Sequence, residues 1–458
     1  GSSMTATQDA VRRLESILAQ DKEVVDYVAY TGQGSPRFYL SLQPELPNAS
    51  YAQFVLRTPD LQAREAVRDR LMTIFKSNEL FPDLRGRVTR LEFGPPVGFP
   101  VQFRVSGPEL DKVRSIADQV KTIVESSPLV RDTQFDWNEQ VRTAKLVINH
   151  EKARRMGINN TMIADQLQLS LQGVPVAQIR RGEELVDIVV RGTPEERLSL
   201  GNLPDIQLVG LNGQSIPLSA IASVVPAYED PVIWRRDRNV VMTVRSDLSD
   251  GVQGPYATQQ LLPMLKSVID SLPPGYEIKA GGAIEESELA NIAIAAVFPT
   301  MILVTLTLLM LQLKSFSRMF MVFMTFPLGI IGVVPSLMIF QAPFGFVALL
   351  GVIALGGMIM RNSVILVDQI DQDIAAGAAA WDAIVEATVR RSRPVVLTAA
   401  AAILAMIPLS RSVFWGPMAL SIMGGLIAAT TLTLFFLPAL YATWFKVKKA
   451  ATAEMGTA

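Results

Sequence analysis

The most informative titratable side chain is a single arginine inside an otherwise apolar stretch. Arg361 follows 42 residues, from Met319 to Met360, that carry no formal charge. A charge near the centre of a bilayer costs about 2.5–3.5 kcal/mol on insertion scales, so it is retained where ions or protons are handled. The alternative is that Arg361 reaches back to the cytoplasmic interface, but the helix end expected at 368 lies about 10 Å further on. The pattern therefore favours a functional arginine.

Most other chemistry is excluded by composition. The chain has no cysteine and one histidine, His150, so a disulfide framework, a thiolate nucleophile and a Cys- or His-based metal cluster are ruled out. We find no nucleophile–base pair and no phosphate loop, and we expect neither a metal site nor a cofactor. The net charge of −1 leaves no basic surplus for nucleic acid. An enzyme is the least favoured class.

The elements that must position Arg361 are membrane helices. About a quarter of the residues before Glu288 are charged, against about a tenth of those after it. Uncharged stretches near the 20 residues that span a bilayer predict five helices in contact with lipid. Their expected ranges are about 289–312, 319–340, 345–368, 394–410 and 418–445. In the last one, Gly424 with Ala428 and Gly425 with Ala429 predict close helix packing.

Lysine and arginine placement predicts the orientation. Three basic groups fall on one side of the five helices, and the opposite loops hold only Arg411. The groups are Lys314 and Arg318, then Arg390, Arg391 and Arg393, then Lys446, Lys448 and Lys449. Basic loops are cytoplasmic, so the first 287 residues are expected on the other side. Such a region needs an upstream export signal, and nothing near Gly1 is apolar enough, so we expect a piece of a longer polypeptide.

The aqueous part has the pattern of an α+β fold. Helical stripes begin near Leu61, Leu110 and Pro255, and strand-like runs flank them, which predicts split βαβ units with helices on one face of a sheet. The expected strands are Asp26–Tyr30, Phe38–Leu42, Arg87–Phe93, Val101–Val105, Val130–Phe135 and Val240–Val244. A segment over about 140–232 interrupts the second unit. It contains a hairpin, Val174–Ile179 with Glu184–Val190, around Arg181-Gly182.

Six motifs in order resemble the C-terminal half of a resistance-nodulation-division (RND) efflux pump, most like its hydrophobe/amphiphile (multidrug) branch. The likeness extends over nearly the whole chain. They are Leu272-Pro273-Pro274-Gly275-Tyr276, Gly281-Gly282, Pro327-Leu328-Gly329-Ile330-Ile331-Gly332, Gly357-Met358-Ile359-Met360-Arg361-Asn362-Ser363, Arg391-Ser392-Arg393-Pro394 with Thr398, and Met423-Gly424-Gly425 with Phe436-Leu437-Pro438. The resemblance implies ferredoxin-like porter subdomains, an inserted docking subdomain and transmembrane helices eight to twelve. These implied elements agree with the five helices, the split βαβ units and the inserted segment that the residue pattern predicts.

The resemblance also implies domains and partners. We expect a cloning remnant and lead-in over 1–20, porter subdomains over 21–105 and over 106–139 with 233–285, and a docking subdomain over 140–232. The transmembrane bundle takes 286–449 and a cytoplasmic tail 450–458. The implied assembly is a proton-driven homotrimer in the bacterial inner membrane with a large periplasmic region. It works with a periplasmic adaptor protein and an outer-membrane channel.

In the resembled family, a proton relay joins acidic residues of the N-terminal half to a basic residue and a hydroxyl in this half. The matching positions are Arg361 and Thr398, and the acidic partners lie in the missing half. The family usually has lysine at the position of Arg361. Arginine stays protonated in proteins, so here the carboxylates alone would titrate. Without the resemblance, the Thr398 hydroxyl would be read as bonded to its own helix.

The substrate assignment also follows from the resemblance. Val101, Phe103 and Val105 alternate and so share one strand face, which by pattern alone lies against the subdomain's own helices. In the resembled pumps this strand lines the drug pocket, and Phe38 falls near a loop that separates two pockets. We therefore expect export of hydrophobic or amphiphilic compounds. The alternatives are a heavy-metal RND exporter, disfavoured because the strand offers no thioether or carboxylate ligand, and a related lipid- or protein-export auxiliary, the latter disfavoured by the docking insertion.

Overall fold

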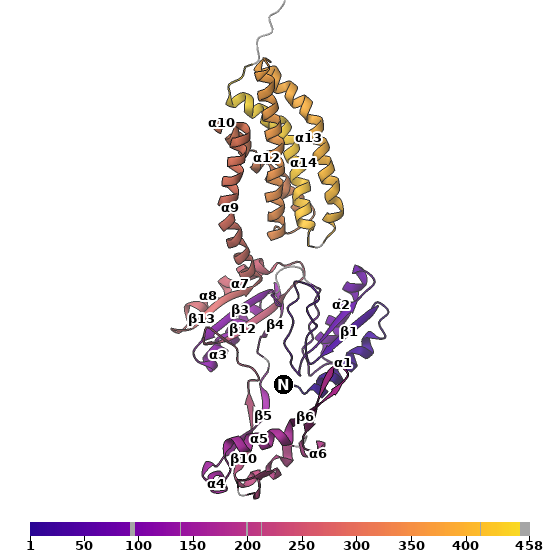
Figure 1. The fold of residues 1–458 in the computed structure, drawn as a ribbon, viewed down its shortest axis with the longest axis vertical. Coiled ribbons are helices and arrows are strands. Elements are labelled where there is room, and N and C mark those ends of the chain that lie inside the picture. Colours follow the sequence, from indigo (N-terminus) through magenta and orange to yellow (C-terminus); the bar gives the residue numbers. More distant parts are fainter. Residues whose placement is uncertain (92–96, 138, 198–199, 212, 413, 449–458) are drawn as a thin grey trace, which may run out of the picture.

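The computed structural model describes residues 1–448 except 92–96, 138, 198–199, 212 and 413. The molecule is elongated, with the membrane helices at one end and the inserted segment at the other (Figure 1). Between them lie two aqueous units, one around β1 and α2 and one around β3 and β12. A mixed α/β aqueous part followed by five long apolar helices confirms the predicted fold class.

Among the described residues, five helices are long and apolar enough to cross a membrane, as the sequence predicted. They are α9 (Ala283–Leu313), α10 (Phe316–Phe323) continued by α11 (Ile330–Ile339), α12 (Phe346–Ala375), α13 (Ala380–Ser410) and α14 (Gly416–Trp444). The largest difference is α13, which starts 14 residues before the expected 394. The first turns of α13 are not apolar throughout, but they pack against the protein through the buried side chains of Ala383, Ile384 and Ala387. This packing stabilises them as a helix. Hydropathy marks the part of a helix in lipid, and it does not mark the ends of the helix.

The second membrane helix is interrupted. A 3₁₀ turn over Phe326–Gly329 separates α10 from α11 and contains Pro327. Proline has no N–H to donate and clashes with the preceding turn, which explains the break. The side chain of Thr325, just before the turn, is fully buried and donates to the carbonyl of Val322 at 2.6 Å. The Val322 carbonyl therefore accepts both the hydroxyl and the backbone N–H of Thr325, the latter at 3.0 Å.

Helices α11 and α14 approach one another at glycines. A Cβ added to Gly332 would lie 2.1 Å from the carbonyl oxygen of Gly424 and 2.6 Å from the Cβ of Ala428. A Cβ on Gly424 would lie 2.2 Å from the Cβ of Ser336, whose hydroxyl donates to the carbonyl of Leu420 at 2.9 Å. The small residues predicted to allow close packing in the last helix therefore do so against α11.

Gly332→Ala is expected to lower the unfolding free energy of the full-length protein by about 2–3 kcal/mol, near the upper end for overpacking. The added methyl meets backbone atoms of Gly424, which cannot rotate away. Thermal unfolding in detergent measures the effect. Gly345→Ala is the matched control, because nothing lies within 4 Å of its added Cβ. Equal stability of the two variants would contradict the packing.

The second aqueous unit is an antiparallel sheet covered by helices on one face. The strand order is β11-β12-β3-β13, and β4 also pairs with β12. The elements are β3 (Val101–Gly107), α3 (Leu110–Glu125), β4 (Val130–Phe135), β11 (Arg235–Arg236), β12 (Asn239–Leu248), α7 (Gly254–Met264), α8 (Lys266–Asp270) and β13 (Glu277–Gly282). The predicted strands at Val101, Val130 and Val240 are all present. Strand β13 runs directly into membrane helix α9.

The first aqueous unit differs from its prediction in three places. It contains α1 (Met4–Leu18), β1 (Asp26–Thr31), β2 (Ala52–Arg57) and α2 (Leu61–Ser77), with β1 and β2 antiparallel. Residues expected as a lead-in form α1, whose Leu18 is buried with Val67 and Leu71 of α2. The run Phe38–Leu42 is irregular because it lies in the exposed link between β1 and β2. No strand forms over 87–91, and the rest of that predicted run lies outside the described residues.

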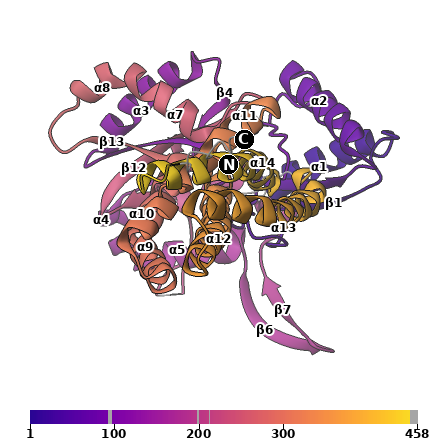
Figure 2. The same cartoon turned by 90° about the horizontal axis from the view of Figure 1, so that it is seen from above.

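Two antiparallel strands, β5 (Val141–Ile148) and β10 (Ala222–Glu229), connect the inserted segment to the second unit. Between them lie α4 (His150–Arg155), α5 (Asn160–Leu171), α6 (Pro194–Arg197), β8 (Gln207–Val209) and β9 (Ser215–Pro217). The predicted hairpin is present as β6 (Val174–Arg181) and β7 (Glu184–Val190). It projects from the body of the protein (Figure 2), and nearly every side chain on it is exposed.

Candidate functional site

The two predicted relay residues lie on neighbouring membrane helices and are exposed. Arg361 is on α12, next to the buried residues Asn362 and Ser363. Thr398 is on α13, and its hydroxyl donates to the carbonyl of Val395, one turn back, at 3.0 Å. No hydrogen bond or ion pair joins either side chain to another side chain in the part of the protein that the structure describes. Their assignment to a proton relay therefore stays a prediction.

A buried polar contact that the sequence did not indicate lies beside Arg361. The hydroxyls of Ser363 on α12 and Thr325 at the interrupted helix are 3.0 Å apart, and neither side chain is exposed. Polar groups inside a membrane bundle pair with one another because no water is available. The position of Thr325, two residues before the helix-breaking Pro327, is the sequence feature that could have indicated this contact.

Charged residues join the predicted cytoplasmic ends of four membrane segments. The Arg318 Nε lies 2.9 Å from an oxygen of Asp371 on α12, and the Tyr441 hydroxyl of α14 donates to Asp371 at 2.8 Å. Arg390 of α13 pairs with Asp373 at 3.3 Å, and Arg391 donates to the amide oxygen of Gln369 at 2.6 Å. Arg390 and Arg391 thus lie within a helix instead of in the predicted loop.

The predicted substrate strand faces the core. Val101, Phe103 and Val105 of β3 are each 0% exposed, and they pack with Val113 and Val120 of α3 and with other buried residues of α7 and β12. These contacts give no support to the assignment of the three residues to a substrate pocket, which stays a prediction. Side chains alternate along a strand, so one face of β3 is turned to the helices and excluded from solvent. The apolar character of that face is explained by core packing and does not identify a substrate. The argument against a metal exporter loses its basis for the same reason.

The fourth predicted substrate residue, Phe38, is accessible. It lies in the irregular link between β1 and β2, is 52% exposed and packs on Tyr39 with ring centroids 5.3 Å apart. An exposed aromatic side chain on a link between strands is available to a ligand. Nothing in the contacts of Phe38 identifies a substrate, so its role stays a prediction.

The opposite face of the second sheet is polar and meets the first unit. Asp247 of β12 is almost fully buried and accepts two hydrogen bonds from Arg87, at 2.7 and 2.6 Å. Asp250 accepts two from Arg68 of α2, at 2.8 and 3.1 Å. Bidentate arginine–carboxylate pairs fix geometry as well as charge. The two aqueous units are therefore held by oriented ion pairs, and no pattern in the sequence connected residues so far apart.

Burial and pairing set the titration of this interface. The pKa of Asp136 is raised by burial, against hydrogen bonds from Thr243, and the pKa of Arg245 is lowered by burial. Hydrogen bonding to Arg90 lowers the pKa of Glu65 to about 2, and hydrogen bonding to Arg68 lowers that of Asp250. Carboxylates with a lowered pKa stabilise the folded state above their unfolded value and lose that effect as the pH falls. The interface therefore weakens in strong acid.

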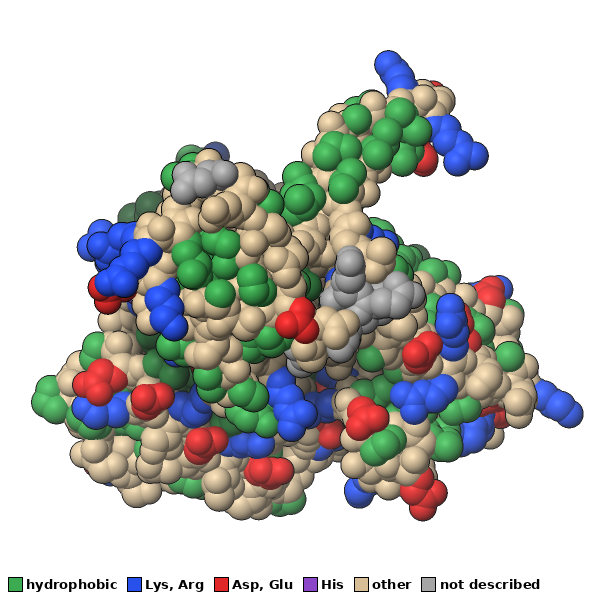
Figure 3. Space-filling view, turned by 90° about the horizontal axis from the view of Figure 1, so that it is seen from below, with side chains coloured by type: hydrophobic (Ala, Val, Ile, Leu, Met, Phe, Trp, Pro, Cys, Tyr) green, Lys and Arg blue, Asp and Glu red, His purple; other side chains and the backbone are tan. Residues whose placement is uncertain are grey.

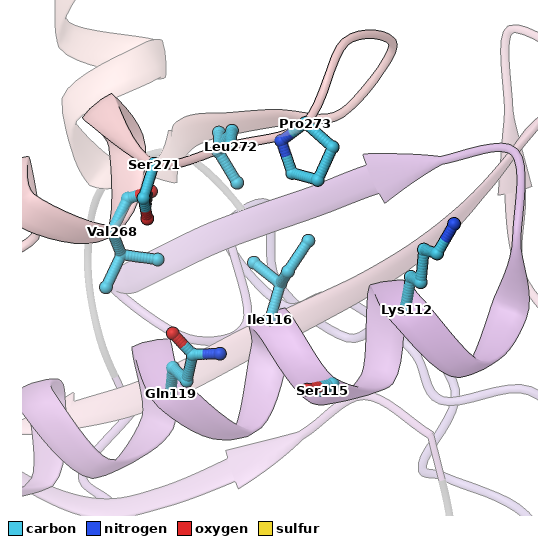
Figure 4. Close-up of a pocket in the computed structure, with 8 residues that line it drawn as sticks. All are labelled: Lys112, Ser115, Ile116, Gln119, Val268, Ser271, Leu272 and Pro273. Carbon is cyan, nitrogen blue, oxygen red and sulfur yellow. Dashed lines mark hydrogen bonds between the residues drawn. The ribbon is translucent and has the colours of Figure 1, made fainter.

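Two surface hollows among the described residues have volumes of about 210 and 390 Å³. One of about 210 Å³ lies between α3 and α8, with Ile116, Val268 and Leu272 at its apolar side and Lys112 and Gln119 at its rim (Figure 4). Lys112 pairs with Glu109 at 2.8 Å.

Over the described residues, no group of three or more His, Cys, Asp or Glu side chains is placed to hold a metal ion. Charged side chains are scattered over the face seen from below (Figure 3).

The chain is similar to known proteins over almost its full length. The profile of the AcrB/AcrD/AcrF family matches residues 1–444. The nickel-cobalt-cadmium resistance protein NccA of Alcaligenes xylosoxydans xylosoxydans is 27% identical over 421 residues, which are 87% of this chain and 39% of NccA. The nickel and cobalt resistance protein CnrA of Cupriavidus metallidurans is 27% identical over 436 residues, or 91% of this chain and 40% of CnrA. The chain thus spans about two fifths of these relatives.

Solved structures share the fold. The X-ray crystal structures of a heavy metal efflux pump in crystal forms I and II superpose with TM-scores of 0.74 and 0.75 at 22% identity. Each covers 97% of this chain, which corresponds to 46% and 45% of those pumps. Five membrane helices with a large aqueous region place the protein in the bacterial inner membrane with a periplasmic part. The chain belongs to the AcrB/AcrD/AcrF family, the RND family that its motifs resemble.

Proposed function

We propose that the chain is the C-terminal part of an inner-membrane exporter of divalent transition-metal ions such as Ni²⁺, Co²⁺ and Cd²⁺. One observation carries the proposal: two relatives that match 87% and 91% of the chain are resistance proteins for these metals. The fold supports it, because the superposed structures are of a heavy metal efflux pump. The metal is cargo, bound and released in each transport cycle.

This proposal corrects the expectation of multidrug export. That expectation came from the resemblance to the multidrug branch, in which the strand matching Val101, Phe103 and Val105 lines the drug pocket, whereas here these side chains are buried in the core. The relatives named for metal resistance contradict it as well. The heavy-metal exporter, considered from the sequence as the alternative, takes its place. The motifs of the membrane helices identify the family, and they do not distinguish its branches.

We propose that export is driven by protons through Arg361 and Thr398. Both side chains are exposed on the described helices and so are free to meet acidic partners in the part of the relatives that this chain does not span. Arginine keeps its proton, so Arg361 would act as a fixed cation beside carboxylates that titrate. Protonation of those carboxylates would release Arg361, and their deprotonation would recapture it.

The proposed assembly is a homotrimer with a periplasmic adaptor protein and an outer-membrane channel. The exposed hairpin β6–β7 supports it: Val176, Ile179 and Leu185 are 60%, 53% and 68% exposed. Apolar side chains on a projecting hairpin are typical of surfaces that pair with another chain. A neighbouring protomer is the partner that this proposal assigns to the hairpin.

Metal accumulation in cells tests the function. Cells that express the full-length protein with its adaptor and channel are expected to hold several-fold less Ni²⁺ and Co²⁺ than cells that express an Arg361→Ala variant. The difference should disappear when a protonophore collapses the proton gradient. Equal metal content in both strains, with the protein present in the membrane, would contradict metal export. A difference that survives the protonophore would contradict proton coupling alone.

A further inference from the structure

Helix α9 is the continuous connection between the membrane bundle and the second aqueous sheet. It begins at Ala283, directly after β13 ends at Gly282, and it runs from the sheet to the far end of the bundle (Figure 1). Only 6% of its membrane-spanning window is buried within the described helices, against 44% for α12 and for α14. Within the described part of the protein, α9 is buried at Ile284 near its aqueous end and at Leu309 and Leu313 at its other end.

Backbone contacts fix this aqueous end. The Ala283 N–H donates to the carbonyl of Pro100, the residue before β3, at 2.9 Å. Gly282 has a φ of +73°, and an added Cβ would lie 2.6 Å from the same carbonyl. A side chain would therefore be strained by the backbone and would also clash. The first residue of α9 is thus joined to the start of β3.

One ion pair extends this junction to side chains. The Arg104 Nη2 of β3 donates to the Glu285 Oε2 of α9 at 2.6 Å, and the Arg236 Nη2 of β11 lies 3.8 Å from the other oxygen. The side chains of Arg104 and Glu285 are only 19% and 32% exposed. Gly281 makes room for the pair, because an added Cβ would lie 2.8 Å from the Arg104 Cζ. Two strands of the sheet therefore meet one carboxylate on the membrane helix.

We infer that the Arg104–Glu285 pair is a positioning contact that passes movement of α9 to the second aqueous sheet. The inference rests on the proposed transport function. A partly exposed ion pair contributes little to folding stability, so its removal should leave the protein folded. Arg104 lies on the polar face of β3, the face opposite the core residues Phe103 and Val105. A shift of Glu285 with α9 would therefore act on the polar face of the sheet, the face that also carries the Arg87–Asp247 pair to the first unit.

The test uses the full-length pump in proteoliposomes with an imposed proton gradient. Glu285→Gln and Arg104→Gln are each expected to lower the maximum rate of Ni²⁺ export about tenfold, with the half-saturating concentration unchanged within about twofold. The double variant should be no slower than either single one, because both remove the same contact. Glu286→Gln is the matched control, since Glu286 lies beside Glu285 on the same turn and is exposed. Its export should equal that of the wild type.

A readout that needs no cargo separates this inference from the proposed function. These 458 residues contain no cysteine, so spin labels can be placed at Lys266→Cys on α8 and Trp415→Cys before α14 once any cysteine in the rest of the full-length pump has been replaced. The gradient should change the distance between the labels in the wild type and in Glu286→Gln, and not in Glu285→Gln. With that result, absence of Ni²⁺ export from the wild type would refute metal export and leave the inference standing.

Three results would overturn the inference. The first is an unchanged label response in Glu285→Gln. The second is a wild type with no gradient-dependent movement, because there is then nothing to transmit. The third is a rate loss in Glu285→Gln that follows lowered thermal stability, which would make the pair structural.

Discussion

Replacing Arg361 with alanine in the full-length protein is expected to reduce proton-driven metal export to background while the amount of folded protein in the membrane stays the same. The described part of the protein offers the side chain no hydrogen bond or ion pair, so its removal breaks no polar contact there. Removal of an intramembrane charge also lowers the cost of insertion, by about 2.5–3.5 kcal/mol on insertion scales. Export by membrane vesicles, normalised to the protein in the membrane, measures the effect.

Two further variants decide what Arg361 does. Ile365→Ala changes a side chain one turn along the same face of α12 and is expected to leave export close to that of the wild type. Arg361→Lys keeps the charge and loses the planar fork that binds a carboxylate through two hydrogen bonds. Full activity with lysine would show that the charge is sufficient. Normal export by Arg361→Ala would remove Arg361 from the mechanism, and loss of inserted protein would give it a structural role.

Phe103→Ala is expected to destabilise the second aqueous unit by about 3–5 kcal/mol, the usual cost of deleting a buried phenylalanine. The ring is 0% exposed between the sheet and its helices, so alanine leaves a cavity. Urea unfolding of the full-length protein, followed through its aqueous part, measures the change. Export of Ni²⁺, Co²⁺ and Cd²⁺ should fall by the same factor, because the loss comes from unfolded protein.

Phe38→Ala is the matched control, since it removes the same ring from a position that is 52% exposed. Its unfolding free energy should stay within about 0.5 kcal/mol of the wild type. Unchanged stability of Phe103→Ala with selective loss of one metal would show that Phe103 contacts cargo. The burial of the Phe103 side chain between the sheet and its helices would then be incorrect.

The membrane helices could be predicted from the sequence because each span must satisfy its backbone hydrogen bonds internally in lipid. This local requirement produces long apolar runs, and all five runs correspond to helices. The start of α13 at Ala380 was not readable in the same way. Its first turns lie outside lipid, where polar residues are compatible with a helix, so hydropathy carried no signal for them.

In the aqueous part, the alternation of Val101, Phe103 and Val105 determined that they share one face, because the period of a strand is local geometry. What that face meets depends on helices more distant in sequence, and only the packed structure decided it. The ion pairs are the extreme case: Arg104 and Glu285 are 181 residues apart, and Arg87 and Asp247 are 160 apart. The sequence by itself determined the family and the membrane helices, because motifs and hydropathy are local. The contacts that orient the helix–sheet junction and the inter-unit interface required the tertiary structure, because a surface arginine has many possible carboxylate partners and only the fold selects one.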